Sequence, residues 1–211
     1  MGIEEFVRAT LGKDVSGHGH DHALRVLSFA EAIRKEEGGD EAYIRGCALL
    51  HDCLDSKLGL DNAMQEERVY ACLLENGYDE KKASAMIRTM SRMSFHLHDE
   101  SDLSLEDRIV RDADRLDALG KIGARRALEY GKSKGRPLFS DEDRKNIVKG
   151  IAPHGESTIA HFFDKLLILD RYLYTDTARK MALPLKEELR LCLKGLFEEN
   201  GMRLDPSILP D

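Results

Sequence analysis

The chain has 211 residues, of which 42% are hydrophobic and 34% are charged, and its formal net charge is −7. This composition is typical of a folded globular protein and excludes an intrinsically disordered chain. The acidic balance argues against a nucleic-acid polymer or an anionic membrane surface as partner, and no stretch approaches the roughly eighteen apolar residues of a membrane-spanning helix.

The first half of the chain shows apolar residues at helical spacing. They predict a helix over residues 22–37, ended by Gly38 and Gly39. Asp40 is a candidate cap for a second helix that runs to about Leu50. Two more helices are predicted, over residues 62–75 and after a cap at Asp79, followed by a polar loop over residues 94–103.

The second half continues the helical pattern. A long helix is predicted over residues 105–130, with a bend near Gly120, and then a flexible loop over residues 131–140. A short helix is expected at 141–149, and the last two at 158–174 and 175–196, with a break near Pro184 and a loose tail after Gly201. Since no segment alternates strictly between apolar and polar residues, the fold class is predicted to be all-α.

The four cysteines form no C-x-x-C pair, and they are Cys47, Cys53, Cys72 and Cys192. Buried reduced thiols are therefore expected, as in a cytoplasmic protein. The N-terminus has no basic start followed by an apolar run, so we expect no secretory signal. Both observations predict a cytoplasmic location.

Four residues from three predicted helices form a candidate metal site: His22, the adjacent pair His51 and Asp52, and Asp114. If the first two predicted helices pack antiparallel about the Gly38-Gly39 joint, His22 and His51 end at a similar level. Imidazole and carboxylate suit a divalent transition metal. Asp112, Asp114 and Asp117 share one helix and repel one another, so a solvated acidic face is the alternative for that segment.

The motifs around these residues resemble a known family. They are HALRV at the first His, LLHD at the second, and IVRDADRLDALGKIGARRALEYG around the last Asp. The chain resembles the HD-domain metal-dependent phosphohydrolase superfamily, and more closely its small bacterial hydrolases of the YedJ/YpgQ type. The resemblance covers about residues 15–185 and implies one helical-bundle domain over residues 1–211, with a C-terminal extension at about 186–200 and the metal site in its helical core.

The resemblance assigns metal ligation to His22, His51, Asp52 and Asp114, and leaves Asp112 and Asp117 to orient ligands or helix ends. It implies one divalent ion, Mn²⁺ first, with Fe²⁺, Co²⁺, Ni²⁺ or Mg²⁺ as alternatives. The run before the first ligand is shorter than in the family and rich in histidine. The roles of His18, His20 and Asp21 therefore stay open, and exposed loop imidazoles are the alternative for the two histidines.

Further polar residues are candidates for catalysis and substrate binding. Asp55 could orient or deprotonate the attacking water, and Lys57 could neutralise phosphate charge, unless both belong to a solvated loop. Arg25 follows His22 by one helical turn, and Arg125 matches the family's GAR stretch, so both are phosphate-binding candidates, with surface pairing as the alternative. A second metal could use two histidines of the polar loop, His96 and His98.

The predicted function is hydrolysis of a phosphate ester or anhydride by a metal-activated water that attacks phosphorus. The resemblance implies a small phosphorylated substrate, most of all a nucleotide, and hence a nucleoside triphosphate pyrophosphohydrolase or a nucleotidase. The alternatives are a two-metal phosphodiesterase of cyclic nucleotides or dinucleotides and a non-catalytic metal-containing nucleotide sensor. A homodimer stays open, because Phe162, Phe163 and Leu166 could belong to the core or to an interface.

Overall fold

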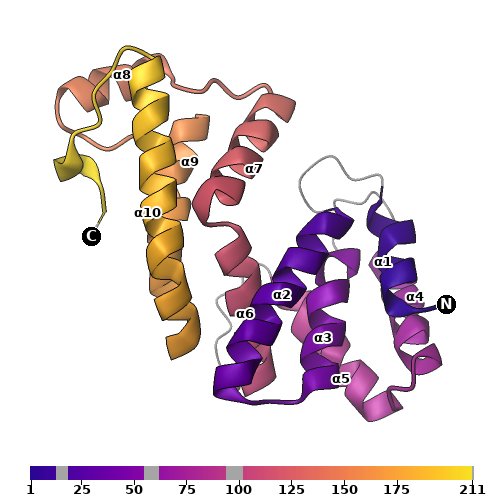
Figure 1. Ribbon diagram of the computed structural model, residues 1–211. Helices are drawn as coiled ribbons and strands as arrows, with labels where there is room; N and C mark the ends of the chain where they lie inside the picture. The colour runs from indigo at the N-terminus through magenta and orange to yellow at the C-terminus, as the bar shows by residue number, and fades with distance from the viewer. Residues whose placement is uncertain (13–18, 55–61, 94–101, 211) are drawn as a thin grey trace. The chain divides into compact units, whose positions relative to one another are not determined.

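Figure 1 shows the computed structural model, which describes residues 1–12, 19–54, 62–93 and 102–210. Within these ranges all regular secondary structure is helical and no strand occurs, which confirms the all-α prediction. The chain forms two compact units, residues 1–114 and 115–211, and the division falls inside one helix. A single domain over residues 1–211 stays a prediction.

The first unit begins with the helix pair that carries the predicted metal ligands. Its elements are α1 (Ile3–Leu11), α2 (His20–Glu37), α3 (Glu41–Leu50), the 3-10 helix η1 (His51–Leu54), α4 (Asn62–Glu75), α5 (Glu80–Ser91) and most of α6 (Leu105–Asp117). Gly38 has φ +87°, which only glycine adopts readily, and the Asp40 side chain accepts a hydrogen bond of 3.0 Å from the Tyr43 backbone N–H. The predicted turn and cap between α2 and α3 are thus confirmed.

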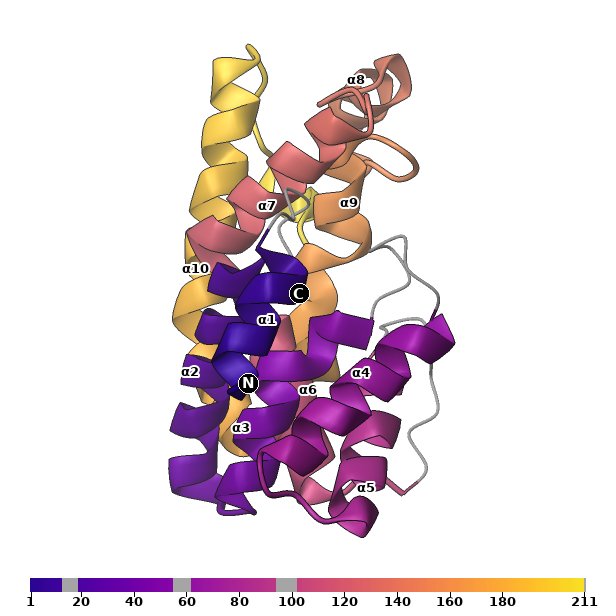
Figure 2. The ribbon, with the colours of Figure 1, turned by 90° about the vertical axis from the view of Figure 1, so that its right-hand side faces the viewer.

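Helix α3 lies at the centre of this unit and packs against α1, α2 and α5 (Figures 1 and 2). Gly46 allows the close approach of α5, because a Cβ at this position would lie 2.9 Å from Tyr78 Oη and would meet the Met86 methyl group. The apolar side chains of α3 are fully or almost fully buried: Ile44, Cys47, Ala48, Leu49 and Leu50. This packing fixes the end of α3, where His51 and Asp52 follow.

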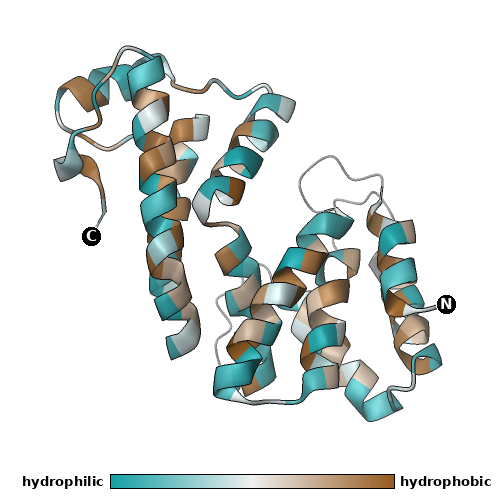
Figure 3. Ribbon diagram, viewed as in Figure 1, coloured by the Kyte–Doolittle hydropathy of each residue, from teal (hydrophilic) through white to brown (hydrophobic). Residues whose placement is uncertain are grey.

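Helix α1 was not predicted from the sequence, although its signal was present. Two acids, Glu4 and Glu5, stand in its first turn, and Phe6, Val7 and Leu11 are buried on one face. The predicted helix over residues 22–37 begins two residues earlier, at His20. Figure 3 shows the hydrophobic and hydrophilic bands that alternate along α1, α2 and α3, as expected of amphipathic helices.

The second unit contains the rest of the helices. They are α7 (Gly120–Ser133), α8 (Asp141–Val148), α9 (Thr158–Asp164), the 3-10 helix η3 (Leu166–Tyr172), α10 (Asp176–Glu199) and the 3-10 helix η4 (Pro206–Ile208). The predicted long helix over 105–130 is in fact two helices, α6 and α7. Gly120 has φ +66°, a left-handed conformation that ends helical geometry, so the bend expected there is a break.

Two predictions for the C-terminal region are wrong. Helix α10 continues through Pro184, where we expected a break, because the residues before and after it bury one common face against the unit. The tail after Gly201, predicted to be loose, forms η4, buries Ile208, and accepts a hydrogen bond of 3.2 Å from Arg190 Nη2 at the Pro210 carbonyl. Packing therefore overrides the local sequence signal at both places.

The aromatic residues of α9 belong to the core of the second unit. Phe162 and Phe163 are buried, and so is Leu166 at the start of η3. Between core and interface, the structure thus places these three side chains in the core. Among the described helices, none is both long enough and apolar enough to cross a bilayer.

Candidate metal centre

The four predicted metal ligands meet at one place in the first unit. His22 lies in the first turn of α2, and His51 and Asp52 follow the end of α3 in η1, while Asp114 lies near the end of α6. Both histidines and Asp52 are buried, whereas the Asp114 side chain is 35% exposed. Three of the four side chains are therefore shielded from solvent, and Asp114 is the one that solvent reaches.

The orientation of His51 is set by the backbone of its own helix. Its Nδ1 lies 2.8 Å from the Ala48 carbonyl oxygen. A carbonyl oxygen only accepts, so Nδ1 carries the proton and Nε2 presents a lone pair to the cluster. A hydrogen bond of this kind fixes the tautomer and ring orientation of many metal-binding histidines.

The donor atoms are spaced as ligands of one ion. His22 Nε2 lies 3.2 Å from His51 Nε2, 3.3 Å from Asp52 Oδ2 and 3.4 Å from Asp114 Oδ1. His51 Nε2 lies 3.4 Å from Asp52 Oδ1 and 3.9 Å from Asp114 Oδ1. An ion bound at about 2.1 Å places adjacent donors about 3.0 Å apart and opposite donors about 4.2 Å apart in octahedral geometry.

The charges of the cluster also call for a cation. Two carboxylates and two imidazoles converge in a largely buried volume, where a bound cation would offset the cost of burying carboxylate charge. His22, His51 and Asp114 each offer a donor atom within 4.8 Å of the other two, a metal-ligand arrangement to which Asp52 adds both of its oxygens. The residues present thus fit a divalent transition metal with two protein imidazoles and two carboxylates.

The acids beside Asp114 have other environments. Asp117 is fully buried, and its Oδ2 accepts a hydrogen bond of 2.6 Å from Arg126 Nη1. This ion pair gives Asp117 a structural role in the second unit and favours Asp114 as the ligand. Asp112 is fully buried as well, so the solvated acidic face that we considered for this segment does not describe these two acids.

The predicted substrate-binding arginines have different surroundings. Arg25 is half-buried on α2, one turn after His22. The Arg125 side chain is 67% exposed, and its Nε lies 3.8 Å from Glu129 Oε1 on the next turn of α7, which is the surface pairing named as the alternative. Asp55 and Lys57 lie outside the described residues, as do His18, His96 and His98.

The residues next to the ligands include a histidine and a thiol. His20 Nε2 is buried without a hydrogen-bond partner among the described residues, while Asp21 is almost fully exposed and 4.0 Å from His20 Nδ1. Burial, together with the neighbouring Asp52 charge, raises the pKa of the Cys53 thiol to about 12. The Cys53 thiol is therefore protonated at neutral pH and is not activated for nucleophilic attack.

Sequence reasoning missed a buried amide that supports η1. Gln65 of α4 is buried, and its Nε2 donates a hydrogen bond of 3.3 Å to the Cys53 carbonyl oxygen. Arg68 Nη1 in turn donates to Gln65 Oε1 at 2.8 Å. No sequence spacing links Gln65 to Cys53, because the contact depends on how α4 packs on η1.

Known proteins share these features. The sequence model of the HD domain matches residues 19–119, which contain all four clustered residues. The Bacillus subtilis protein YpgQ is 36% identical over 183 residues, which cover 85% of this chain and 83% of YpgQ. The crystal structure of YpgQ in complex with ADP superposes with a TM-score of 0.73 at 31% identity, over 93% of this chain and 95% of that one.

An HD-superfamily hydrolase from Bacillus thuringiensis has the same fold. Its crystal structure gives a TM-score of 0.73 at 29% identity and covers 94% of this chain and 95% of its own. The family match, these relatives and the His/Asp cluster agree with one another. The chain therefore belongs to the HD-domain family and is a hydrolase of the HD superfamily, a class of metal-dependent enzymes.

Proposed function

We propose that this hydrolase cleaves a phosphate ester or anhydride of a nucleotide, as a nucleoside triphosphate pyrophosphohydrolase or a nucleotidase. The observation that carries the proposal is the convergence of His22, His51, Asp52 and Asp114 with one side open to solvent. The structure of YpgQ with ADP supports a nucleotide as substrate, because that relative matches over nearly its whole length.

The four residues would hold one divalent ion, with Mn²⁺ as the first choice and Fe²⁺, Co²⁺, Ni²⁺ or Mg²⁺ as alternatives. Such an ion supplies a Lewis acid for a phosphoryl oxygen and lowers the pKa of water to near neutrality. The Ala48 carbonyl keeps the Nε2 lone pair of His51 directed at the cluster. Because Asp114 is partly exposed, water and the substrate phosphate group approach the ion from the side of Asp114.

The predicted catalytic and phosphate-binding residues complete the proposed mechanism. Asp55 accepts the proton of the attacking water, and Lys57 neutralises the charge on the phosphate group. Arg25 lies on the same face of α2 as His22 and contacts a substrate phosphate oxygen. Arg125 is the second phosphate contact in this proposal, and its exposed position on α7 leaves it accessible to a ligand.

The cellular setting belongs to the same proposal. All four cysteines are free, and three of them are buried, which fits a reducing cytoplasm. The substrate is a small phosphorylated molecule rather than a nucleic-acid polymer, as the net charge of −7 favours. A measurement of the molecular mass in solution would distinguish a monomer from a homodimer.

The test is release of phosphate and pyrophosphate from a panel of nucleoside mono-, di- and triphosphates with Mn²⁺, Co²⁺, Ni²⁺, Mg²⁺ or a chelator. Wild type is compared with Asp52→Ala and with Glu5→Ala, an exposed acid on α1. We expect metal-dependent release of phosphate or pyrophosphate that only Asp52→Ala abolishes. Mass spectrometry should show that this variant has also lost its bound metal. Equal turnover by Asp52→Ala would overturn the ligand assignment.

Two other outcomes would replace the proposal. Turnover of cyclic nucleotides or dinucleotides with two metal ions per chain would favour the phosphodiesterase, whose second ion would need His96 and His98. Tight nucleotide binding without any product would favour the sensor. Substitution of His96 and His98 together separates the one-metal enzyme from the two-metal enzyme by metal stoichiometry.

A further inference from the structure

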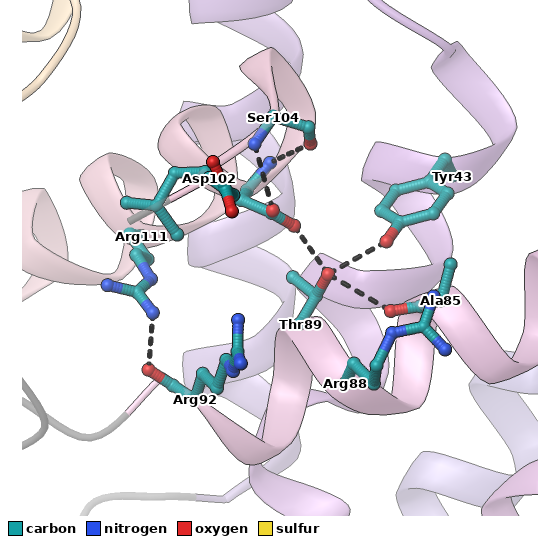
Figure 4. A pocket seen from close by; sticks show the side chains of 10 residues that line it. Tyr43, Ala85, Arg88, Thr89, Arg92, Asp102, Ser104 and Arg111 are labelled. Atoms are coloured by element: carbon teal, nitrogen blue, oxygen red, sulfur yellow. Dashed lines mark hydrogen bonds between the residues drawn. The ribbon is translucent and has the colours of Figure 1, made fainter. Parts of the chain in front are cut away.

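A second polar site lies in the first unit, apart from the four clustered residues. It is a pocket of about 230 Å³ between the start of α3, the end of α5 and the start of α6 (Figure 4). We call it the arginine pocket, because three arginines line it, from two different helical segments. Its lining residues are Tyr43, Ala85, Arg88, Thr89, Arg92, Asp102, Leu103, Ser104, Asp107 and Arg111.

Arg111 is a buried cation that has no carboxylate partner among the residues that the structure describes. Its residue is only 4% exposed, its Nη2 donates a hydrogen bond of 2.7 Å to the Arg92 carbonyl oxygen, and its Nε is buried with no hydrogen-bond partner among the described residues. None of the ion pairs that the described residues form includes Arg111. Burial of a guanidinium with so little compensation is costly unless an anion shares its environment.

The natural partner for Arg111 on the same helix face is Asp107, one turn earlier, and its carboxylate is bound elsewhere. Asp107 Oδ2 accepts from the Ser104 backbone N–H at 3.0 Å, and Oδ1 accepts from the Thr89 hydroxyl. The Thr89 proton thus goes to an acceptor, and Tyr43 Oη donates to Thr89 Oγ1 at 2.7 Å. These hydrogen bonds, drawn as dashed lines in Figure 4, engage both carboxylate oxygens of Asp107 with groups other than Arg111.

The pocket therefore contains guanidinium charge that no described carboxylate pairs with, at Arg88 and at Arg111. Two carboxylates line it as well, Asp102 and Asp107, the second of which is engaged by two hydrogen bonds. Arg88 is exposed at the rim and, within the described part of the chain, forms no ion pair. Guanidinium groups at a polar pocket favour planar or tetrahedral oxyanions, which they bind by several hydrogen bonds at once.

The size of the pocket selects among anions. A volume of about 230 Å³ is below the roughly 300–1,000 Å³ that is usual for sites of drug-sized ligands, and it suits a smaller anion such as phosphate or pyrophosphate. The pocket shares no residue with the metal centre. On α3, Tyr43 precedes His51 by eight residues, or about 12 Å along the helix axis.

We propose that the arginine pocket binds a small oxyanion of the phosphate class, with Arg111 as its buried counter-charge, without help from the metal centre. The oxyanion is free phosphate or pyrophosphate, or the phosphate group of a larger molecule whose remainder stays in solvent. The proposal concerns binding only and does not depend on which nucleotide the enzyme cleaves.

The experiment is calorimetric titration of metal-stripped protein, in a buffer without other oxyanions, with inorganic phosphate, pyrophosphate and adenosine monophosphate. Wild type is compared with Arg111→Gln, Arg88→Gln and the control Arg108→Gln, an exposed arginine of α6 that does not line the pocket. We expect metal-independent binding that weakens at least tenfold in Arg111→Gln and a few-fold in Arg88→Gln, and that stays unchanged in Arg108→Gln. Tighter binding of the nucleotide than of phosphate would identify the source of the anion.

A thermal readout covers the case in which Arg111→Gln does not fold. Phosphate should raise the Tm of wild type and Arg108→Gln more than that of Arg88→Gln, a variant at an exposed position. The proposal is overturned if metal-stripped wild type binds neither phosphate nor pyrophosphate, if binding requires the metal, or if Arg88→Gln and Arg111→Gln bind as wild type does. Because the metal is absent, these outcomes are independent of catalysis.

Discussion

The same substitution should destabilise the protein to very different extents at two adjacent arginines of α7, Arg125 and Arg126. Arg126 Nη1 lies 2.6 Å from Asp117 Oδ2, and the two side chains are 16% and 1% exposed. Loss of one partner of a buried ion pair costs about 3–5 kcal/mol, and the partial exposure of Arg126 places the expected cost near the lower value, at about 3 kcal/mol. Arg126→Met should therefore remove a large share of the protein's stability.

The matched control is Arg125→Met. This arginine is mostly exposed and 3.8 Å from Glu129, so its replacement should cost less than about 0.5 kcal/mol. Urea denaturation followed by circular dichroism measures both variants, and the double variant Arg126→Met/Asp117→Leu should recover much of the loss because no buried charge then stands alone. Equal, small losses in both single variants would refute the reasoning. A raised KM in stable Arg125→Met would support its proposed phosphate contact.

Three further predictions concern thiols, pH and backbone conformation. Burial raises the pKa of Cys47 and Cys53. A thiol reagent at neutral pH should therefore label the half-buried Cys192 first, and should label Cys47 and Cys53 only when the protein unfolds. Fast labelling of Cys53 in the folded protein would contradict its burial. Burial, together with Lys165 and Arg136, lowers the pKa of His161 below its usual 6.5. Because the unfolded chain then binds more protons than the folded chain, the free energy of unfolding should fall as the pH drops below about 6.5. The denaturation midpoint of His161→Gln should depend less on pH than that of wild type, and an equal dependence would contradict this prediction. Gly120 and Gly135 both have φ +66°, but only at Gly120 would a Cβ meet neighbours, Glu188 Oε2 and Leu185 Cδ2 at 3.1 Å. In urea denaturation, Gly135→Ala should therefore lower the free energy of unfolding by about 1 kcal/mol, and Gly120→Ala should lower it clearly more. Equal losses would show that Glu188 and Leu185 move aside at no cost.

The cluster of His22, His51, Asp52 and Asp114 could be predicted because its residues are attached to strong local signals. The apolar stripes of α2 and α3 and the glycine turn at Gly38 were enough to bring His22 and His51 to one level. Asp114 could be singled out from its two acidic neighbours only by the resemblance to a family. The structure adds the physical reason, since Asp117 is already paired with Arg126 and Asp114 lies beside the two histidines.

Other features could not be predicted because they depend on contacts between distant segments. The pair Asp117–Arg126 spans the break between α6 and α7, so no helical spacing indicates it. Pro184 argued for a break in α10, and the burial of Leu189, Leu193 and Phe197 on the same face as Ala182 outweighs that local preference. The arginine pocket is formed by residues from three elements. The sequence spacing suggests an ion pair between Asp107 and Arg111, and only the structure shows that Asp107 accepts from Thr89 instead.

The position of the four clustered residues explains how a buried site can still receive a substrate. Residues in the middle of a helical bundle are surrounded on all sides, whereas His22, His51 and Asp114 each lie within the first or last turns of a helix or just after it. Donors at helix ends can contact an ion from one side and leave its other side accessible. The 35% exposure of the Asp114 side chain indicates where solvent reaches the cluster. Four protein donors leave two positions of an octahedral ion. An Asp114→Asn variant should therefore keep the buried donors in place yet weaken both metal binding and turnover, and unchanged metal affinity would show that Asp114 serves the substrate rather than the ion.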